Sequence, residues 1–175
     1  VEMCGFPVSL LSGGEVSIAM NGCIDDGFTN LTDLEWVVAR VAQTSSIPLI
    51  CDIEDGFGGP LAVYRSARRL AIAGAAAIQL EDAGDMEDST KILRRDKYLA
   101  KIRAAIEALK GTECMLIART NADPSIPEEM KEGCERLKEA MDLGADLAMM
   151  VKVSTYEKAV EMNKIVTGPK VFADV

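Results

Sequence analysis

The sequence predicts an α/β fold on a parallel sheet, namely a TIM (β/α)8 barrel that is incomplete at both ends of the chain. Short apolar runs alternate with segments of helical periodicity along almost all of the 175 residues, which is typical of βα units. The strand-like runs are apolar throughout, as in sheets that helices cover. About six units can be distinguished, whereas a complete barrel has eight and about 250 residues. A doubly wound open sheet is the alternative, but Ser12-Gly13-Gly14 matches its phosphate-binding glycine pattern only weakly.

The first half of the chain contains the elements that lead to the first acidic motif. Phe6–Leu11 is an apolar run and is predicted to be a strand that ends in a glycine turn. Thr32–Ala42 is predicted to be helical because its apolar residues recur on one side. Ile47–Cys51 is a second buried strand. The following helix, Leu61–Ala73, has a proline just before it and a glycine just after it, which are the usual boundary residues.

The second half repeats the same alternation. Four further apolar runs predict strands at Ala75–Leu80, Cys114–Ala118, Leu147–Val153 and Lys170–Asp174. Three intervening segments have helical spacing of apolar residues, and they are Tyr98–Leu109, Glu128–Leu143 and Tyr156–Ile165. No linker or low-complexity tract interrupts the pattern, so we expect one catalytic barrel domain over residues 1–175.

The composition limits the classes of function. Hydrophobic residues make up 49% and charged residues 27%, as in ordinary globular proteins, and the net charge of −9 disfavours nucleic acid or an anionic membrane as a partner. No apolar stretch approaches the roughly 20 residues that span a bilayer. Five cysteines without a C-x-x-C pair fit a reducing cytoplasm, where we expect the protein. The absence of histidine excludes Ser-His-Asp and Cys-His catalysis within this chain.

Acidic side chains follow two neighbouring predicted strands. Asp52 and Glu54 come after Ile47–Cys51, and Glu81 comes after Ala75–Leu80. Residues two apart on an extended backbone project from the same face, so the carboxylates of Asp52 and Glu54 are expected to lie together. Like charges at the end of a buried strand call for a compensating cation, and carboxylate oxygens favour Mg²⁺ or Mn²⁺ over zinc. The alternative is a solvated acidic loop.

The next predicted strand ends in a basic residue, Arg119. Parallel strands of an α/β array present their carboxyl ends on one face, where ligands bind. We therefore predict a metal held by Asp52, Glu54 and Glu81, with Arg119 nearby to bind a substrate carboxylate. In a chain of net charge −9, a small anionic substrate needs such a local positive site.

Several motifs occur in a fixed order along nearly the whole chain. They are Ser12-Gly13-Gly14, a Gly-x-x-Asp-x-Gly loop containing Asp25, Cys-Asp-Ile-Glu-Asp-Gly-Phe-Gly from Cys51, Ala-Ile-Gln-Leu-Glu-Asp from Ala77, Lys-Ile-Arg-Ala-Ala from Lys101 and Ile-Ala-Arg-Thr-Asn-Ala from Ile117. Each motif alone is weak, but the ordered set resembles the isocitrate lyase/phosphoenolpyruvate mutase superfamily. The resemblance implies a TIM barrel, commonly a homotetramer with swapped last helices. It also implies binding of magnesium and of α-oxo- or α-hydroxycarboxylates, with C–C or P–C chemistry through an enolate.

The resemblance also implies individual roles. Asp52 matches the principal metal-binding aspartate, Glu54 stands where a second aspartate is usual, and Glu81 matches a glutamate of the metal site. Asp25 matches a loop aspartate near the metal-bound water, and Arg119 matches the arginine that grips the substrate carboxylate. The catalytic candidates are therefore Asp25 and Arg119, and the substrate-binding candidates are Ser12, Gly13, Gly14, Asp52 and Arg119.

Three departures from the family pattern concern the chemistry. Lyases of the superfamily commonly carry a Cys-Gly-His loop after the Glu-Asp motif, but residues 83–93 contain neither cysteine nor histidine. That segment is interpreted either as a gating lid or as a solvated acidic turn. Glu54 replaces a shorter aspartate. Lys152 follows a strand where the family often has Glu, His or Ser, and it is read either as a substrate ligand or as a salt-bridge partner.

These features predict a magnesium-dependent lyase, with manganese possible. It would cleave a C–C bond of a small 2-hydroxy or 2-oxo di- or tricarboxylate through a metal-stabilised enolate. Phosphoenolpyruvate mutase or phosphonopyruvate hydrolase chemistry and oxaloacetate decarboxylation are alternatives, which the missing Cys-Gly-His loop favours. A non-catalytic barrel that binds a metal and a carboxylate is an alternative of another class.

Overall fold

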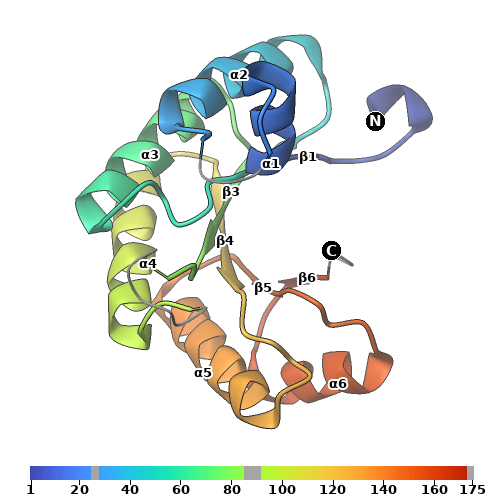
Figure 1. The fold of residues 1–175 in the computed structure, drawn as a ribbon, viewed down its shortest axis with the longest axis vertical. Coiled ribbons are helices and arrows are strands. Elements are labelled where there is room, and N and C mark those ends of the chain that lie inside the picture. Colours follow the sequence, from blue (N-terminus) through green and yellow to red (C-terminus); the bar gives the residue numbers. More distant parts are fainter. Residues whose placement is uncertain (25–27, 85–91, 173–175) are drawn as a thin grey trace.

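The computed structural model describes residues 1–24, 28–84 and 92–172. In these ranges six strands form one sheet in which every pair is parallel and each strand lies beside the one before it along the chain (Figure 1). The strands are β1 (Ser9–Leu11), β2 (Leu49–Asp52), β3 (Ala77–Glu81), β4 (Met115–Thr120), β5 (Leu147–Met150) and β6 (Lys170–Val171). A doubly wound sheet reverses its strand order at one point, whereas this order runs in one direction as in a barrel. The chain therefore forms part of a (β/α) barrel.

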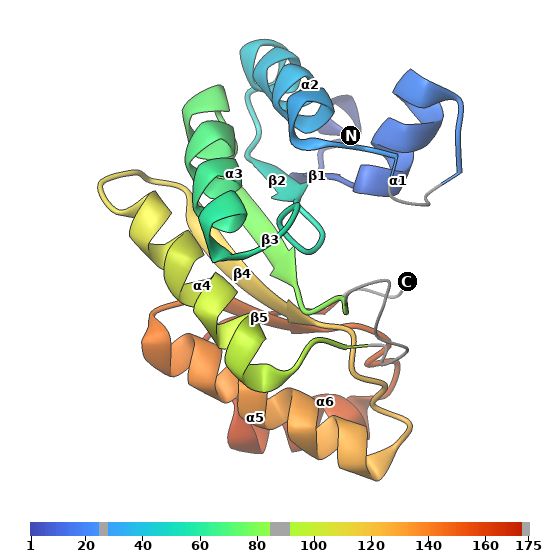
Figure 2. The same ribbon diagram turned by 60° about the vertical axis from the view of Figure 1, so that its left-hand side comes forward.

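The main helices cover one face of this sheet, as the two views of the ribbon show (Figures 1 and 2). They are α2 (Leu31–Thr44), α3 (Pro60–Ala73), α4 (Arg95–Leu109), α5 (Pro127–Leu143) and α6 (Tyr156–Ile165). Short helical segments at Glu2–Cys4, Gly13–Val16 (α1) and Ser17–Asn21 flank β1. In the described residues no helix has the length and apolar character needed to cross a bilayer.

Local sequence explains where the helices begin and end. Asn30 caps α2 because its side chain accepts hydrogen bonds from the amides of Thr32 and Asp33, while the Asp33 side chain accepts one from the Asn30 amide. The helices α3 and α5 begin at prolines and end at Gly74 and Gly144, whose φ angles of 110° and 116° suit only glycine well. The boundaries of α3 and α5 agree with the sequence-based expectation, whereas α2 extends beyond the expected Thr32–Ala42 at both ends.

Several predicted boundaries were wrong. The strand β1 starts at Ser9 rather than Phe6, and Gly13 and Gly14 begin the short helix α1 instead of forming a turn. The strand β5 ends at Met150 rather than Val153 because Lys152 adopts a left-handed φ of 58°, which no strand continues through. The helix α4 begins at Arg95, before the predicted start at Tyr98. Of the predicted strand Lys170–Asp174, the end lies outside the described residues.

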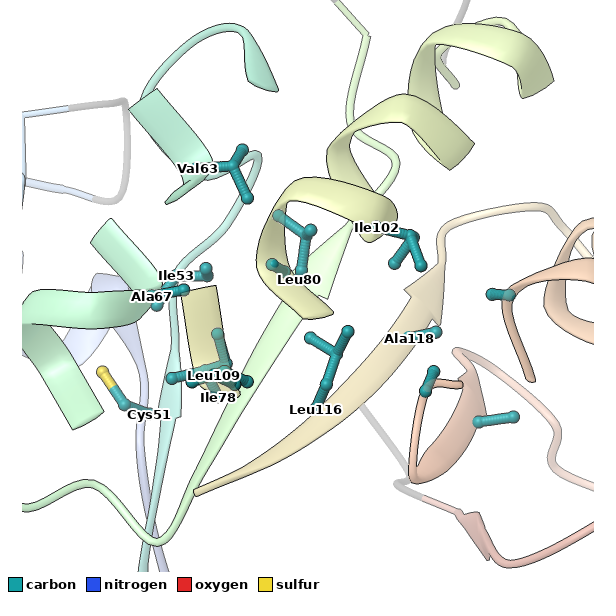
Figure 3. Packing of buried hydrophobic residues seen from close by; sticks show 14 of the residues in the cluster. Cys51, Ile53, Val63, Ala67, Ile78, Leu80, Ile102, Leu109, Leu116 and Ala118 are labelled. Atoms are coloured by element: carbon teal, nitrogen blue, oxygen red, sulfur yellow. The ribbon is translucent and has the colours of Figure 1, made fainter. Parts of the chain in front are cut away.

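The main core lies between the sheet and its helices. Figure 3 shows how side chains from β3 and β4, including Ile78, Leu80 and Leu116, pack with Val63 of α3 and Ile102 of α4. Because side chains alternate along a strand, the intervening residues face the opposite side of the sheet. There a second, smaller apolar cluster contains Ala77, Ile117, Met149 and Val151. We call this second side the inner face and the helix-covered side the outer face.

Tyr98 of α4 anchors the ends of two strands from the outer face. It is fully buried, and its hydroxyl donates a hydrogen bond of 2.9 Å to the carbonyl oxygen of Arg119 on β4 and lies 3.5 Å from that of Leu80 on β3. Burial raises the pKa of this phenol well above its usual value, so Tyr98 stays a neutral donor. The backbone that carries Arg119 is thus fixed by a side chain of the core.

Replacing Tyr98 by phenylalanine tests this anchor. Tyr98→Phe leaves a buried carbonyl without its donor, and we expect the free energy of unfolding in urea to fall by about 1–3 kcal/mol. The matched control is Tyr64→Phe, since Tyr64 is exposed on α3 and its change should stay within about 0.5 kcal/mol. Equal stability of the Tyr98→Phe protein and the wild type would show that the hydrogen bond does not hold the strand.

Candidate active site

Four polar side chains extend the inner face beyond its apolar cluster, at the carboxyl ends of β2, β3 and β4. The parallel register aligns Asp52 with Gln79 and Glu81 with Arg119. Side chains two residues apart on a strand face the same side of the sheet. Gln79 and Glu81 therefore lie on the same face as Ala77, and Arg119 lies on the same face as Ile117. Strand pairing and side-chain alternation therefore place these four groups together at one end of the sheet.

Arg119 bridges the two carboxylates of this group. Its Nη1 lies 2.8 Å from Oδ2 of Asp52 and its Nη2 lies 3.0 Å from Oε2 of Glu81. The third nitrogen, Nε, donates to Oδ1 of Asn121 at 3.2 Å. All three nitrogens of the guanidinium are thus engaged within the site, and the positive charge stands between two negative charges.

The two carboxylates are held in a poorly solvated place. Burial raises the pKa of Asp52, although Arg119, the Glu54 amide and the Gln79 side chain at 2.9 Å all favour its ionised form. Burial likewise raises the pKa of Glu81, against the effect of Arg119, and the nearby charge of Asp52 raises it further. Burial disfavours the ionised form of both acids, and the charge of Asp52 disfavours that of Glu81 as well, so positive charge is favoured at this point.

Glu54 lies in a tight turn, so the prediction of an extended backbone from Asp52 to Glu54 was wrong. The strand ends at Asp52, and Glu54 adopts a left-handed φ of 50°. Its amide donates to Oδ1 of Asp52 at 2.9 Å. Its carboxylate packs against Gly13 so closely that a Cβ atom at Gly13 would overlap it. The turn after β2 is thereby brought next to the Ser12-Gly13-Gly14 segment after β1.

The structure does not present Asp52, Glu54 and Glu81 as a preformed triad of ligands. Within the described ranges no group of three or more His, Cys, Asp or Glu residues is arranged to hold a metal ion. The physical reason is that Arg119 occupies the space between Asp52 and Glu81 and satisfies both. The donor set nevertheless fits magnesium, because hard carboxylate oxygens converge on a position that already attracts a cation. The metal site stays a prediction, and Asp25 lies outside the described residues.

A second ion pair on the outer face was missed from the sequence. Asp82 follows Glu81 by one residue, so it projects to the opposite side, where it is fully buried. Its Oδ2 lies 2.6 Å from Nη1 of Arg136 on α5 and accepts from the Thr120 hydroxyl at 2.6 Å, while its Oδ1 accepts from the Asn121 amide at 2.7 Å. The pair fixes the chain on both sides of the Arg119 site. In the sequence, the signal for this pair was Arg136, an arginine at the helical spacing of the apolar residues of α5.

Lys152 lies apart from the Arg119 site as far as the described contacts go. It is exposed after β5, and its charge lowers the pKa of Asp123, behind the larger effect of the Ser125 hydrogen bonds on that carboxyl. The left-handed φ of 58° is unusual for lysine and directs the chain away from the sheet. Among residues 1–24, 28–84 and 92–172, no contact favours a substrate-binding role over a salt-bridge role for Lys152.

Comparison with known proteins gives the chain its family. The sequence model described as phosphoenolpyruvate phosphomutase matches residues 1–173. Oxaloacetate decarboxylase 1 of Pseudomonas fluorescens is 31% identical over 94% of this chain and 57% of its own length. The 2-methylisocitrate lyase of Vibrio cholerae is 30% identical over 95% of this chain and 56% of its own length.

A solved structure agrees with these relatives. The crystal structure of a phosphonopyruvate hydrolase in complex with oxalate and Mg²⁺ has a TM-score of 0.87 and 28% identity, and the match covers 98% of this chain and 61% of that one. This chain thus spans little more than half the length of the proteins that it matches. The family model, the relatives and the fold confirm the resemblance, and the chain belongs to the phosphoenolpyruvate phosphomutase family of the isocitrate lyase/phosphoenolpyruvate mutase superfamily.

Proposed function

We propose that the protein cleaves a C–C bond in a small 2-oxo or 2-hydroxy di- or tricarboxylate with the help of Mg²⁺, for which Mn²⁺ can substitute. The observation that carries this proposal is the Asp52–Arg119–Glu81 bridge at the carboxyl ends of three adjacent parallel strands. Ligands of (β/α) barrels bind at that end of the sheet. The arrangement offers two hard anionic ligands and one planar cation within a single site.

Each residue of the site has a role in the proposed reaction. Asp52 and Glu81 would hold the metal ion, which when bound supplies a Lewis acid for developing negative charge on a substrate oxygen. Arg119 would bind and orient the substrate carboxylate through two parallel N–H groups. Gln79 and Asn121 hold Asp52 and Arg119 in place, and Tyr98 fixes the backbone beneath Arg119. Ser12, Gly13 and Gly14 are proposed to contact the other end of the substrate.

The relatives indicate the substrate class. One acts on oxaloacetate by its name, and a structural relative holds oxalate with Mg²⁺. Oxalate has the two adjacent oxygen-bearing carbons of a 2-oxo acid, which a cation and an arginine can clamp together. Residues 83–93 supply no cysteine or histidine as a proton donor, which favours a reaction whose small enolate product can take its proton from water. Decarboxylation of oxaloacetate to pyruvate is therefore the first reaction to assay.

P–C bond hydrolysis is the second candidate function. The observation in its favour is the likeness to phosphonopyruvate hydrolase over 98% of this chain. The same Asp52, Glu81 and Arg119 would hold phosphonopyruvate, because it shares the 2-oxo carboxylate end with oxaloacetate. Pyruvate released from one substrate but not the other, with phosphate measured alongside, separates the two reactions. Metal and oxalate binding without turnover of either substrate would indicate a non-catalytic binding protein.

Removing the carboxylate of Asp52 should abolish metal-dependent turnover. We expect Asp52→Ala to lower kcat/KM by at least about 100-fold in a pyruvate-release assay with Mg²⁺, because Glu81 alone cannot replace both ligands. The fold should persist, since burial already disfavours the charged form of Asp52. Asp142→Ala removes the same charge from an exposed pair on α5 and should leave turnover unchanged. Wild-type turnover in the Asp52→Ala protein would exclude Asp52 from the site.

Arg119→Met should separate substrate binding from metal binding. We expect oxalate affinity to fall by about 100-fold, since a bidentate charged contact is lost. The affinity for Mn²⁺ without oxalate should stay equal or rise, because the guanidinium that neutralises Asp52 and Glu81 is gone. Calorimetric titration with each ligand measures both quantities. A loss of Mn²⁺ affinity that matches the loss of oxalate affinity would mean that Arg119 supports the metal rather than competing with it.

The raised pKa values of Asp52 and Glu81 predict the pH dependence of metal binding. Protons compete with the cation for both carboxylates, and burial makes this competition begin at a higher pH than for ordinary acids of pKa 3.8 and 4.5. Mg²⁺ affinity should therefore fall on acidification over a pH range above the one in which exposed carboxylates titrate.

The metal-free protein should show the opposite trend in stability. Because both folded pKa values lie above the unfolded ones, these two groups stabilise the fold at low pH, and this contribution is lost as pH rises through the folded pKa values. Asp52→Asn removes one of the two titrating groups, so it should weaken the pH dependence of both the Mg²⁺ affinity and the stability of the metal-free protein. Mg²⁺ affinity independent of pH over this range would show that neither carboxylate binds the ion.

A further inference from the structure

The turn after β2, which we call the acidic turn (residues 53–58), has a backbone that its side chains disfavour. Glu54 and Phe57 are left-handed, with φ angles of 50° and 64°, and neither is a glycine. Gly56 and Gly58 are left-handed as well. Non-glycine residues persist in this conformation only where their surroundings hold them, and such positions cluster at functional sites. The acidic turn therefore needs an external restraint.

Part of the restraint comes from the turn itself. The amide of Gly56 donates to the carbonyl of Ile53 at 2.8 Å, and the amide of Phe57 donates to Oδ1 of Asp55 at 2.8 Å. The amide of Glu81 on β3 donates to the carbonyl of Glu54 at 2.9 Å. This backbone hydrogen bond links Glu54 to Glu81, so the turn helps to set where the two residues lie relative to each other.

A further restraint comes from Lys101 of α4, which lies in the Lys-Ile-Arg-Ala-Ala motif. Its side chain is only 8% exposed, and its Nζ donates to the carbonyl oxygen of Asp55 at 2.8 Å and lies 3.0 Å from Oδ2 of the same residue. A buried ammonium is costly unless hydrogen-bonded acceptors and an opposite charge surround it. Both the main chain and the side chain of Asp55 meet that need, so Lys101 and the acidic turn fix each other.

We propose that Lys101 is a positioning residue that holds the acidic turn, and with it the Glu54 amide that donates to Asp52, in the arrangement that the cation site requires. The proposal rests on the proposed function, because it concerns the same site. Lys101 would act through Asp55, which is the residue of the turn that its Nζ contacts. One side chain thereby binds the Asp55 carbonyl and also the carboxylate group whose Oδ1 accepts from the Phe57 amide.

The experiment uses the full-length protein and two readouts. Lys101→Met keeps the apolar stem and removes the ammonium, and Lys97→Met is the matched control because Lys97 is exposed one turn earlier on α4. Amide hydrogen exchange of residues 53–58 without metal reports the acidic turn, with the amides of β4 as the internal reference. Calorimetric titration with Mn²⁺ alone reports the cation site. Asp55→Asn removes only the negative charge that pairs with Lys101. It replaces Lys101→Met in both measurements if the Lys101→Met protein does not fold.

We expect Lys101→Met to speed exchange in the acidic turn by about tenfold or more relative to β4, and to weaken Mn²⁺ binding by about tenfold or more. Lys97→Met should change neither, and Asp55→Asn should change both in the same direction but less. Proportional acceleration at residues 53–58 and in β4 would mean general destabilisation and would overturn the proposal. Unchanged Mn²⁺ affinity in Lys101→Met, with a loosened turn, would also overturn it.

Failure of the proposed function gives a different pattern. If the wild-type protein binds no Mn²⁺ while Lys101→Met still loosens the acidic turn, then the cation site is wrong and the restraint by Lys101 stands as a feature of the fold. If the wild type binds Mn²⁺ and both readouts are the same in Lys101→Met, then Lys101 does not position the turn.

Discussion

The alternation of side chains along three parallel strands is the constraint on which the rest of this structure depends. Register aligns the ends of β2, β3 and β4, and the period of two then sends each charged residue to one side or the other. Glu81 and Asp82 are adjacent in sequence, yet the first meets Arg119 on the inner face and the second meets Arg136 on the outer face. A shift of one residue in the register of β3 would exchange these partners and dismantle both pairs.

Buried carboxylates on the two faces of the sheet are neutralised to different extents. On the outer face Asp82 is fully buried, and Arg136, Thr120 and a backbone amide satisfy it completely, which suits a structural pair. Removing one partner of such a pair typically costs 3–5 kcal/mol. On the inner face one guanidinium serves two carboxylates whose pKa values burial still raises. This incomplete neutralisation supports the proposal that the inner-face group of Asp52, Glu81 and Arg119 binds an additional cation and an anionic substrate.

The sequence predicted the order of elements well because that order depends on local patterns. Apolar runs, the prolines before α3 and α5 and the glycines after them identified most strands and helices. The turn at Glu54 could not be predicted, because its left-handed backbone is held by Lys101 from a helix that lies far away in the sequence. The bridge by Arg119 was not predicted either. Arg119 was expected nearby as a substrate ligand, whereas tertiary packing brings it between the two carboxylates. Ionic partners separated by many residues are decided by tertiary packing, which local propensity does not encode.

A crystal structure of the protein with Mn²⁺ and oxalate tests the central claim most directly. The account predicts one anomalous scattering peak within about 2.5 Å of a carboxylate oxygen of Asp52, with oxalate on the ion. It also predicts that the Arg119 guanidinium has left Asp52 or Glu81 to contact the oxalate. An Arg119 that still bridges the two carboxylates, with no peak at the ends of β2 and β3, would contradict the account.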